Sequence, residues 1–419
     1  MQSKKNLGKA SIEATVTQAE LDSITNLIAS SAEISDLQGL EHLNNVESLS
    51  LGGNDFTDLT PVSNLKKLTY LQVEQNYNLT SLAPISQLTN LQTLRASYTS
   101  VSDLTPLANL TALTDLVLFD TQVTDVTPLK NLVNLETLHV VNGEGGPKDI
   151  SALKDLPKLS FLNLRYSRVL DLSVFADGFN ALATLQLHDI WDEVGELRVD
   201  ANNKPIQSVT NAVIGYGGEP LTPIDITDEG TYDAATNSIS WPTLTDEDEV
   251  VEYSVRTTFE KNGKVFPFTA TVSVPVVRPT AITFVTNGGE TLPDMQVYAG
   301  DTFGTLPTPK KAGNEFVGWF YDEALTKPAS ATDVVPDSPE TLSGKMTTYS
   351  TAGNITLYAK WKTAAVAKPT DPKVKEVVKT ATAKKLPQTG AENTSSVVLT
   401  ALGLGALITG AYVLNRKRI

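Results

Sequence analysis

A leucine pattern that returns every 22 to 24 residues constrains the fold of this chain more than any other feature. Within each unit the spacing is L-x-x-L-x-x-L-x-L, and one unit alone cannot bury these side chains. Stacked units cover one another's leucines, and each fully buried leucine stabilises the fold by about 1.5–3 kcal/mol. The period therefore predicts a solenoid with one continuous core. Its units begin at Leu43, Leu65, Leu88, Leu110, Leu132, Leu156 and, with phenylalanine in the same place, Phe179.

A proline-containing turn recurs in the units, as in Asp58-Leu59-Thr60-Pro61 and Asp103-Leu104-Thr105-Pro106. Proline suits the first turn of a helix, because the N–H that it lacks would have no partner there. Each such turn is therefore predicted to be a short helical turn on the convex side.

The residues between the buried leucines are predicted to point outward on the concave face, because side chains alternate across a strand. Ser97, Val117, Val141 and Asn163 are among these outward positions. Aromatic and arginine side chains on a rigid concave surface are typical anchors of protein interfaces, whereas the alternative is ordinary surface scatter. The candidate partner-binding residues are Tyr70, Gln72, Arg95, Tyr98, Phe119, His139, Phe161, Arg165 and Tyr166.

The first coil needs a cover, because an open end of the solenoid would expose its leucines to water. Thr17 and Glu20 have the spacing of a capping box. Leu21, Ile24, Leu27 and Ile28 would lie on one face of the helix that follows. Residues 17–42 are therefore predicted to form a helical cap.

The C-terminal residues carry a membrane signal. Residues 397–414 form an uncharged run, and eighteen residues at about 1.5 Å each match the thickness of a bilayer core. Residues 415–418 contain a basic cluster, which the positive-inside rule keeps in the cytoplasm. The order predicts a transmembrane segment with the body of the protein outside.

The pentapeptide Leu386, Pro387, Gln388, Thr389 and Gly390 stands just before this run. Together with the apolar run and the basic end, it resembles the LPxTG cell-wall sorting signal of Gram-positive bacteria. The resemblance implies that sortase cleaves between Thr389 and Gly390 and that Thr389 becomes linked covalently to peptidoglycan, after transient retention in the membrane. Residues 363–385 lack apolar periodicity and are predicted to be a disordered linker.

Between the repeats and the linker, β-branched residues alternate with polar ones between turn signals, which predicts short strands. Residues 191–279 include Val250–Arg256 and Thr269–Val277, and they are predicted to form a sandwich. Residues 280–362 include Gly318-Trp319-Phe320, and they are predicted to form a second β module.

The phrase I/V-T/S-D-L-T-P-L in units of 22 residues resembles the leucine-rich repeats of the internalin family. TQAELDSITNLIAS resembles the internalin cap, residues 226–241 resemble its Ig-like domain, and residues 280–362 resemble the β-grasp-like B-repeat. The resemblance implies a surface adhesin that binds a host cell-surface protein. One departure concerns the loop asparagine, which is present at Asn54 and Asn76 but is replaced by Thr99, Thr121, Gly143 and Ser167, so that the later turns are expected to be looser.

Composition excludes several function classes. A net charge of −15 argues against nucleic acid as a partner, because a phosphate-binding surface needs clustered Lys and Arg. With no cysteine, thiolate catalysis and Cys-ligated zinc are excluded. His42, His139 and His188 stand in no catalytic or zinc pattern and are interpreted as surface residues. We predict no enzyme activity, no cofactor and no metal.

The predicted fold class is an α/β leucine-rich repeat solenoid, internalin-like, followed by two all-β modules, a disordered linker and a transmembrane sorting tail. The predicted function is adhesion or invasion through the concave face, and the alternative is a structural or glycan-binding cell-wall protein. Residues 1–16 contain no apolar run of signal-peptide length, so we expect an export signal upstream of Met1. The predicted parts are 1–16, the cap 17–42, the repeats 43–190, the Ig-like domain 191–279, the B-repeat 280–362, the linker 363–385 and the sorting signal 386–419.

Overall fold

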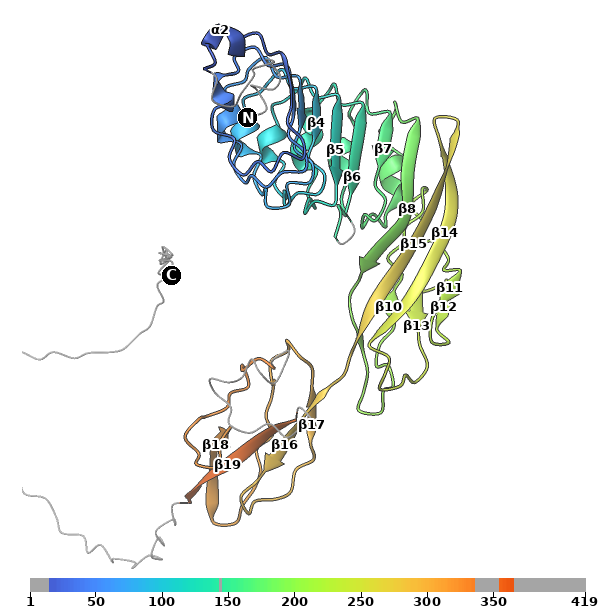
Figure 1. Ribbon diagram of the computed structural model, residues 1–419. Helices are drawn as coiled ribbons and strands as arrows, with labels where there is room; N and C mark the ends of the chain where they lie inside the picture. The colour runs from blue at the N-terminus through green and yellow to red at the C-terminus, as the bar shows by residue number, and fades with distance from the viewer. Residues whose placement is uncertain (1–14, 143–144, 336–353, 365–419) are drawn as a thin grey trace, which may run out of the picture. The chain divides into compact units, whose positions relative to one another are not determined.

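The computed structural model describes residues 15–142, 145–335 and 354–364. The repeats form a parallel sheet in which every strand pairs with the next at the same register, as Figure 1 shows. The predicted leucines form the core, and Leu94, Leu116 and Leu138 are completely buried. The repeat strands are β2 (Ser48–Ser50), β3 (Tyr70–Gln72), β4 (Thr93–Arg95), β5 (Asp115–Phe119), β6 (Thr137–Val141), β7 (Phe161–Asn163) and β8 (Thr184–Glu193). The predicted solenoid is confirmed.

The convex side of the solenoid is built from short 3-10 helices. Proline stands in the first turn of η2, η3, η4 and η5, as the turn pattern predicts. An aspartate caps several of them: Asp58 Oδ1 accepts from the Thr60 N–H at 2.8 Å, and the Thr60 side chain and backbone lower the pKa of Asp58. The helices are η1 (Leu40–His42), η2 (Thr60–Val62), η3 (Ala83–Ile85), η4 (Thr105–Leu107), η5 (Thr127–Asn131), η6 (Ser151–Leu153) and η7 (Leu172–Phe175).

The cap is only partly helical. The capping box of Thr17 and Glu20 is present and starts α2 (Gln18–Leu21), but the helix ends there. The predicted helical face through Ile28 is wrong, because β1 (Asn26–Ile28) is a strand that pairs in parallel with β2. An unpaired edge of the repeat sheet offers backbone hydrogen bonds to this segment, and these outweigh its helical pattern. As a result Leu27 is buried and Ile28 is 59% exposed.

Buried polar side chains line the turn after the repeat strands. Asn76 Nδ2 donates to the carbonyls of Leu51 and Val73, which joins two coils. Thr99 Oγ1 donates only to Ala96 O of its own coil at 2.8 Å, so threonine replaces one of the two contacts.

Gly143, which the pattern puts at the asparagine position of the fifth coil, lies outside the described residues, and the residue before it makes contacts between coils. Asn142 supplies the amide: its Oδ1 accepts from the Thr121 N–H, and its Nδ2 donates to Val123 O. In the coil that follows, the Ser167 hydroxyl is buried without a hydrogen-bond partner.

The repeat sheet continues into the first β module without a break. Strand β8 extends to Glu193 and pairs in parallel with β15, and a sequence boundary at residue 190 therefore falls inside a strand. Figure 1 shows β8, β15 and β14 side by side. The twelve-stranded sheet also holds β9 and β11, whereas β10, β13 and β12 form a second sheet. The module's strands are β9 (Leu197–Arg198), β10 (Val209–Thr210), β11 (Asp225–Ile226), β12 (Thr231–Asp233), β13 (Ser238–Ser240), β14 (Val250–Lys261) and β15 (Lys264–Val277).

The second β module has its own sheet, in the order β17-β16-β19-β18, and its own core. Phe284 and Trp319 pack with ring centroids 4.7 Å apart, and the Trp319 indole donates to Pro307 O. Its strands are β16 (Thr280–Val285), β17 (Met295–Val297), β18 (Asn314–Phe320) and β19 (Ile355–Thr363). The C-terminal half of the chain up to residue 364 is therefore all-β where the structure describes it.

The predicted linker from residue 365 on, the sorting pentapeptide and the apolar run 397–414 lie outside the described residues. Among the residues that are described, no helix has the length and apolar character needed to cross a membrane.

Candidate functional site: the concave face

In-register pairing arranges the outward side chains of the repeats in rows across the sheet. One row runs through Gln72, Arg95, Val117, His139 and Asn163. Neighbouring strands lie about 4.8 Å apart, so adjacent members of a row touch. The rows give the solenoid a face whose composition is set independently of its core.

An aromatic cluster lies diagonally across β5, β6 and β7. The ring centroid of His139 is 5.1 Å from that of Phe119 and 4.9 Å from that of Phe161. All three side chains are half-buried, so they cover one another while each keeps an open side. We call Phe119, His139 and Phe161 the aromatic cluster.

His139 lies on the concave surface, as predicted, but it is half-buried between the two phenylalanines. Burial between the two phenylalanines lowers its pKa, with a smaller contribution from the Arg95 charge, while Asp115 acts in the opposite direction. His139 Nδ1 lies 3.3 Å from Asn163 Nδ2. The neutral ring, with Nδ1 as acceptor, fits this neighbour.

Arg165, just beyond β7, contacts the middle of β8. Its guanidinium lies 5.1 Å above the Tyr166 ring and donates to the Tyr166 hydroxyl at 3.1 Å. It also pairs with Asp189 Oδ2 at 3.3 Å, and Asp189 binds His188 Nδ1 at 2.9 Å. The His188 contact and Arg165 lower the pKa of Asp189. Tyr98 and Tyr166 both lie at turns with φ of 57° and are 41% exposed.

The remaining predicted residues lie on β3 and β4, away from the aromatic cluster. Gln72 donates to Glu74 at 2.9 Å, and Arg95 lies 3.9 Å from the other Glu74 oxygen. Tyr70 is half-buried in the row that leads to Phe161 through Thr93, Asp115 and Thr137. The structure thus brings Phe119, His139 and Phe161 together but separates them from Gln72.

Four of the positions predicted to point outward are in fact buried: Ser97, Val117, Val141 and Asn163. Ser97 Oγ accepts from the Phe119 N–H at 3.1 Å, so this side chain is bound to the backbone of the neighbouring strand β5 and does not project into solvent. Val117 is small and lies between Arg95 and His139 in its row, and larger neighbours cover it.

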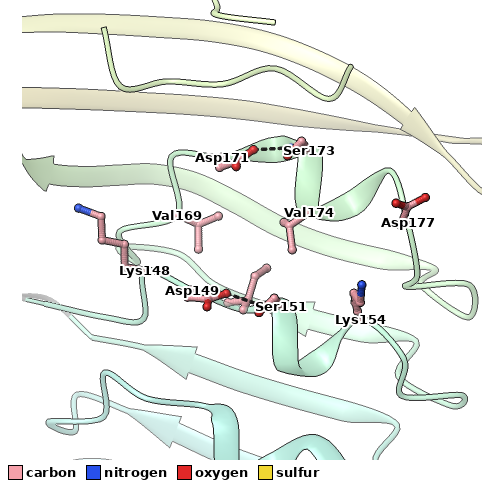
Figure 2. A pocket seen from close by; sticks show the side chains of 10 residues that line it. Lys148, Asp149, Ser151, Lys154, Val169, Asp171, Ser173, Val174 and Asp177 are labelled. Carbon is pink, nitrogen blue, oxygen red and sulfur yellow. Dashed lines mark hydrogen bonds between the residues drawn. The ribbon is translucent and has the colours of Figure 1, made fainter. Parts of the chain in front are cut away.

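A groove of about 470 Å³ with mostly polar lining residues lies between η6 and η7. Figure 2 shows the side chains that line it. Its side chains include Lys148, Lys154 and Asp177. Asp149 accepts from the Ser151 N–H and Asp171 from the Ser173 N–H, each at 2.8 Å. Asp171 is the N-cap of η7, and Asp149 accepts from the first residue of η6, so both carboxylates stabilise the helices that form the groove walls.

Three family models match parts of the chain. Residues 89–131 match the leucine-rich repeats in two copies, residues 281–360 match the Listeria-Bacteroides repeat domain, and residues 378–419 match the LPXTG cell wall anchor motif. The last match covers the sorting signal, and the motif implies sortase processing and linkage to peptidoglycan.

Similar proteins come from Listeria monocytogenes. Internalin H is 32% identical over 141 residues, which cover 33% of this chain and 25% of that protein. The solved structure of an internalin, inlF, is 32% identical, covers 46% of this chain and 62% of its own, and has a TM-score of 0.39. Internalin C2 is 31% identical over 44% of this chain and 90% of its own, with a TM-score of 0.36. This chain therefore spans a quarter of Internalin H and about three-fifths of the inlF structure.

The repeat solenoid and the anchor motif define the class: a leucine-rich repeat protein held on the bacterial cell wall. Within that class the chain is an internalin-like surface protein with an LPXTG anchor.

Proposed function

We propose that this protein is an adhesin that binds a host cell-surface protein through the concave face of its repeats. The observation that carries the proposal is the aromatic cluster of Phe119, His139 and Phe161, half-exposed on a rigid parallel sheet. Burying the open sides of such rings against a partner contributes free energy without the cost of ordering a loop.

The surroundings of the cluster fit an interface. Arg165 and Tyr166 lie at the end of the neighbouring strand, and arginine and tyrosine are enriched among the residues that dominate binding energy. Gln72, Arg95 and Tyr70 would form the polar part of the same surface, with Tyr98 at its edge. Whether adhesion or invasion follows depends on the partner.

The remaining parts would serve display. Sortase would cleave between Thr389 and Gly390, and the new Thr389 carboxyl would be joined to peptidoglycan. In this proposal residues 191–279 are an Ig-like domain, residues 280–362 are a β-grasp-like B-repeat, and residues 363–385 are a disordered linker. These parts would hold the concave face away from the wall.

Leucine-rich repeat and internalin proteins are non-enzymatic binding proteins, and we extend this role to the whole chain, with no cofactor. The competing function is a structural or glycan-binding wall protein that has no host receptor. It predicts that host adherence does not depend on the concave face.

The test compares two triple variants of the full chain displayed on bacteria. F119A/F161A/R165A removes two aromatic rings and a cation from the concave face. Y77A/V133A/K130A removes one ring, one apolar group and one cation at exposed positions elsewhere on the repeats. We expect the first variant to lose at least tenfold in adherence to host cells at equal display, because several interface anchors are lost together. Equal adherence of both variants would exclude the concave face.

A further inference from the structure

The concave face does not end with the repeats. Leu187 pairs with Phe268, and Ile190 pairs with Ala270, and all four side chains are buried on the core side. Two residues of β8, His188 and Asp189, therefore lie opposite Thr269 alone, with Asp189 at φ 57°. This bulge restores the alternation, so that the face continues past it onto β15 and β14.

Trp191 is the large side chain on this continuation. It is 44% exposed, although both of its neighbours, Ile190 and Asp192, are buried. Its indole N–H donates to Ser273 Oγ at 2.8 Å, and that hydroxyl donates to Glu252 Oε1 at 2.6 Å. Because Trp191 pairs with Thr271 and its nitrogen reaches Ser273, the ring lies across β15 and is fixed there with part of its surface in water.

Two carboxylates flank the ring. Glu193 and Glu252 occupy one row, on either side of Ser273, next to the row of Trp191. Within the described ranges neither makes an ion pair, although Asp189 pairs with Arg165, and Asp192 pairs with Arg168 and Lys148. The nearest cation on this face of β14, Arg256, is four residues along the strand from Glu252.

We propose that Trp191, Glu193 and Glu252 bind a lysine or arginine side chain of a partner protein. A cation over an indole face is attracted by the ring quadrupole, and tryptophan is the strongest aromatic partner for it. The two carboxylates add complementary charge, and the net charge of −15 favours a basic partner at long range. This site extends the proposed binding surface of the concave face. That its cation belongs to a host protein rests on the proposed function.

The experiment uses the purified full chain and a blocked eight-residue peptide of alternating glycine and arginine as the probe. The chain has four tryptophans, so the indole ¹⁵N–¹H signal of Trp191 can be assigned by its loss in W191F. We expect the arginine peptide to shift this signal, and a glycine–glutamine peptide of equal length to leave it unchanged. Calorimetry should show weaker peptide binding by roughly 2- to 30-fold in W191A, the range of one cation–π contact.

E193Q/E252Q tests the charge, and E260Q is its matched control, since Glu260 lies at the exposed end of β14 on the same face. Binding should fall in the first variant and stay unchanged in E260Q. A far-UV circular dichroism spectrum of W191A that differs from that of the parent chain would identify a folding defect. In that case the binding measured for E193Q/E252Q alone tests the proposal.

Equal binding by E193Q/E252Q and the parent chain would overturn the proposal. So would a Trp191 signal that responds to a chitin trisaccharide and not to the arginine peptide, which would assign the ring to a glycan. The peptide probe does not involve the aromatic cluster, so F119A/F161A/R165A should bind it with half or more of the parent affinity. A negative peptide test therefore does not contradict the proposed adhesin function, and a negative adherence test does not contradict binding of the arginine peptide.

Discussion

Strand β2 and strands β5, β6 and β7 of the solenoid share one core but present different faces. On β2 the outward residues are Ser48 and Ser50, whereas β5, β6 and β7 present Phe119, His139 and Phe161. The inward leucines are fully buried in both regions, namely Leu49 on β2 and Leu116, Leu138 and Leu162 on β5, β6 and β7. Because the core already fixes the backbone, an aromatic face is not needed for folding, and its presence on β5, β6 and β7 calls for a functional reason.

Core substitutions should have the largest effect and should not distinguish the two regions. Leu49→Ala on β2 and Leu116→Ala on β5 should each lower the free energy of unfolding by about 2–5 kcal/mol, because each leaves a cavity. Urea unfolding followed by circular dichroism measures this, and Val133→Ala at an exposed position should change it by less than about 0.5 kcal/mol. A core that tolerated Leu116→Ala would contradict the shared architecture.

The turn residues should show an intermediate difference. Asn76→Ala leaves the buried Val73 carbonyl without a donor and removes one of the two donors to Leu51 O, the other being Asn54, and it should cost about 1–3 kcal/mol. Thr99→Ala removes one hydrogen bond within a single coil and should cost about 0.5–1.5 kcal/mol. The same unfolding measurement compares them, and an equal cost would mean that the contact between coils adds nothing.

Face substitutions should affect stability less. Phe161→Ala removes one ring of the aromatic cluster and should cost about 1 kcal/mol, because an aromatic pair contributes about 0.5–1.5 kcal/mol beyond area. Ser50→Ala, on the polar region of the face, should lie within about 0.5 kcal/mol of the parent. If Phe161→Ala were as costly as Leu116→Ala, the cluster would belong to the core.

The smallest expected effect is a pH dependence located at His139. Burial depresses its pKa in the folded chain below the ordinary 6.5, so the unfolded chain binds more protons just below that value. Stability should therefore fall as pH decreases from 6.5 toward the folded pKa and then level off. His139→Gln, which does not titrate, should lack this component when unfolding is measured between pH 7.5 and 5, with His42→Gln as the exposed control. Identical pH profiles for parent and H139Q would contradict a half-buried ring with a lowered pKa.

Much of the fold could be predicted from sequence, because the leucine period indicates which side chains must be buried. The strands, the proline turns and the capping box follow from local rules. The length of the cap helix could not be predicted in this way. The pairing of Asn26–Ile28 with β2 is a long-range contact, which a helical pattern cannot reveal.

The candidate site was predictable only in part. The alternation of side chains identified Phe119, His139 and Phe161 as outward residues. It did not predict that these three pack together, or that Val117 and Asn163 are buried by their neighbours. Trp191 is not among the predicted residues, because the leucine period that identifies outward positions ends before it. The bulge at Asp189 inserts one extra residue into the alternation, and the pairing of β15 with β8 is not apparent from the repeat pattern.

Photo-crosslinking on intact host cells tests the central claim most directly, namely that the aromatic region of the concave face contacts a host protein. Benzoylphenylalanine would be placed at position 119 or 161 of the displayed chain and, as a control, at position 50 on the polar region. We predict the same crosslinked host protein from positions 119 and 161, and much less from position 50. No crosslink from either aromatic position, with adherence intact, would contradict the account.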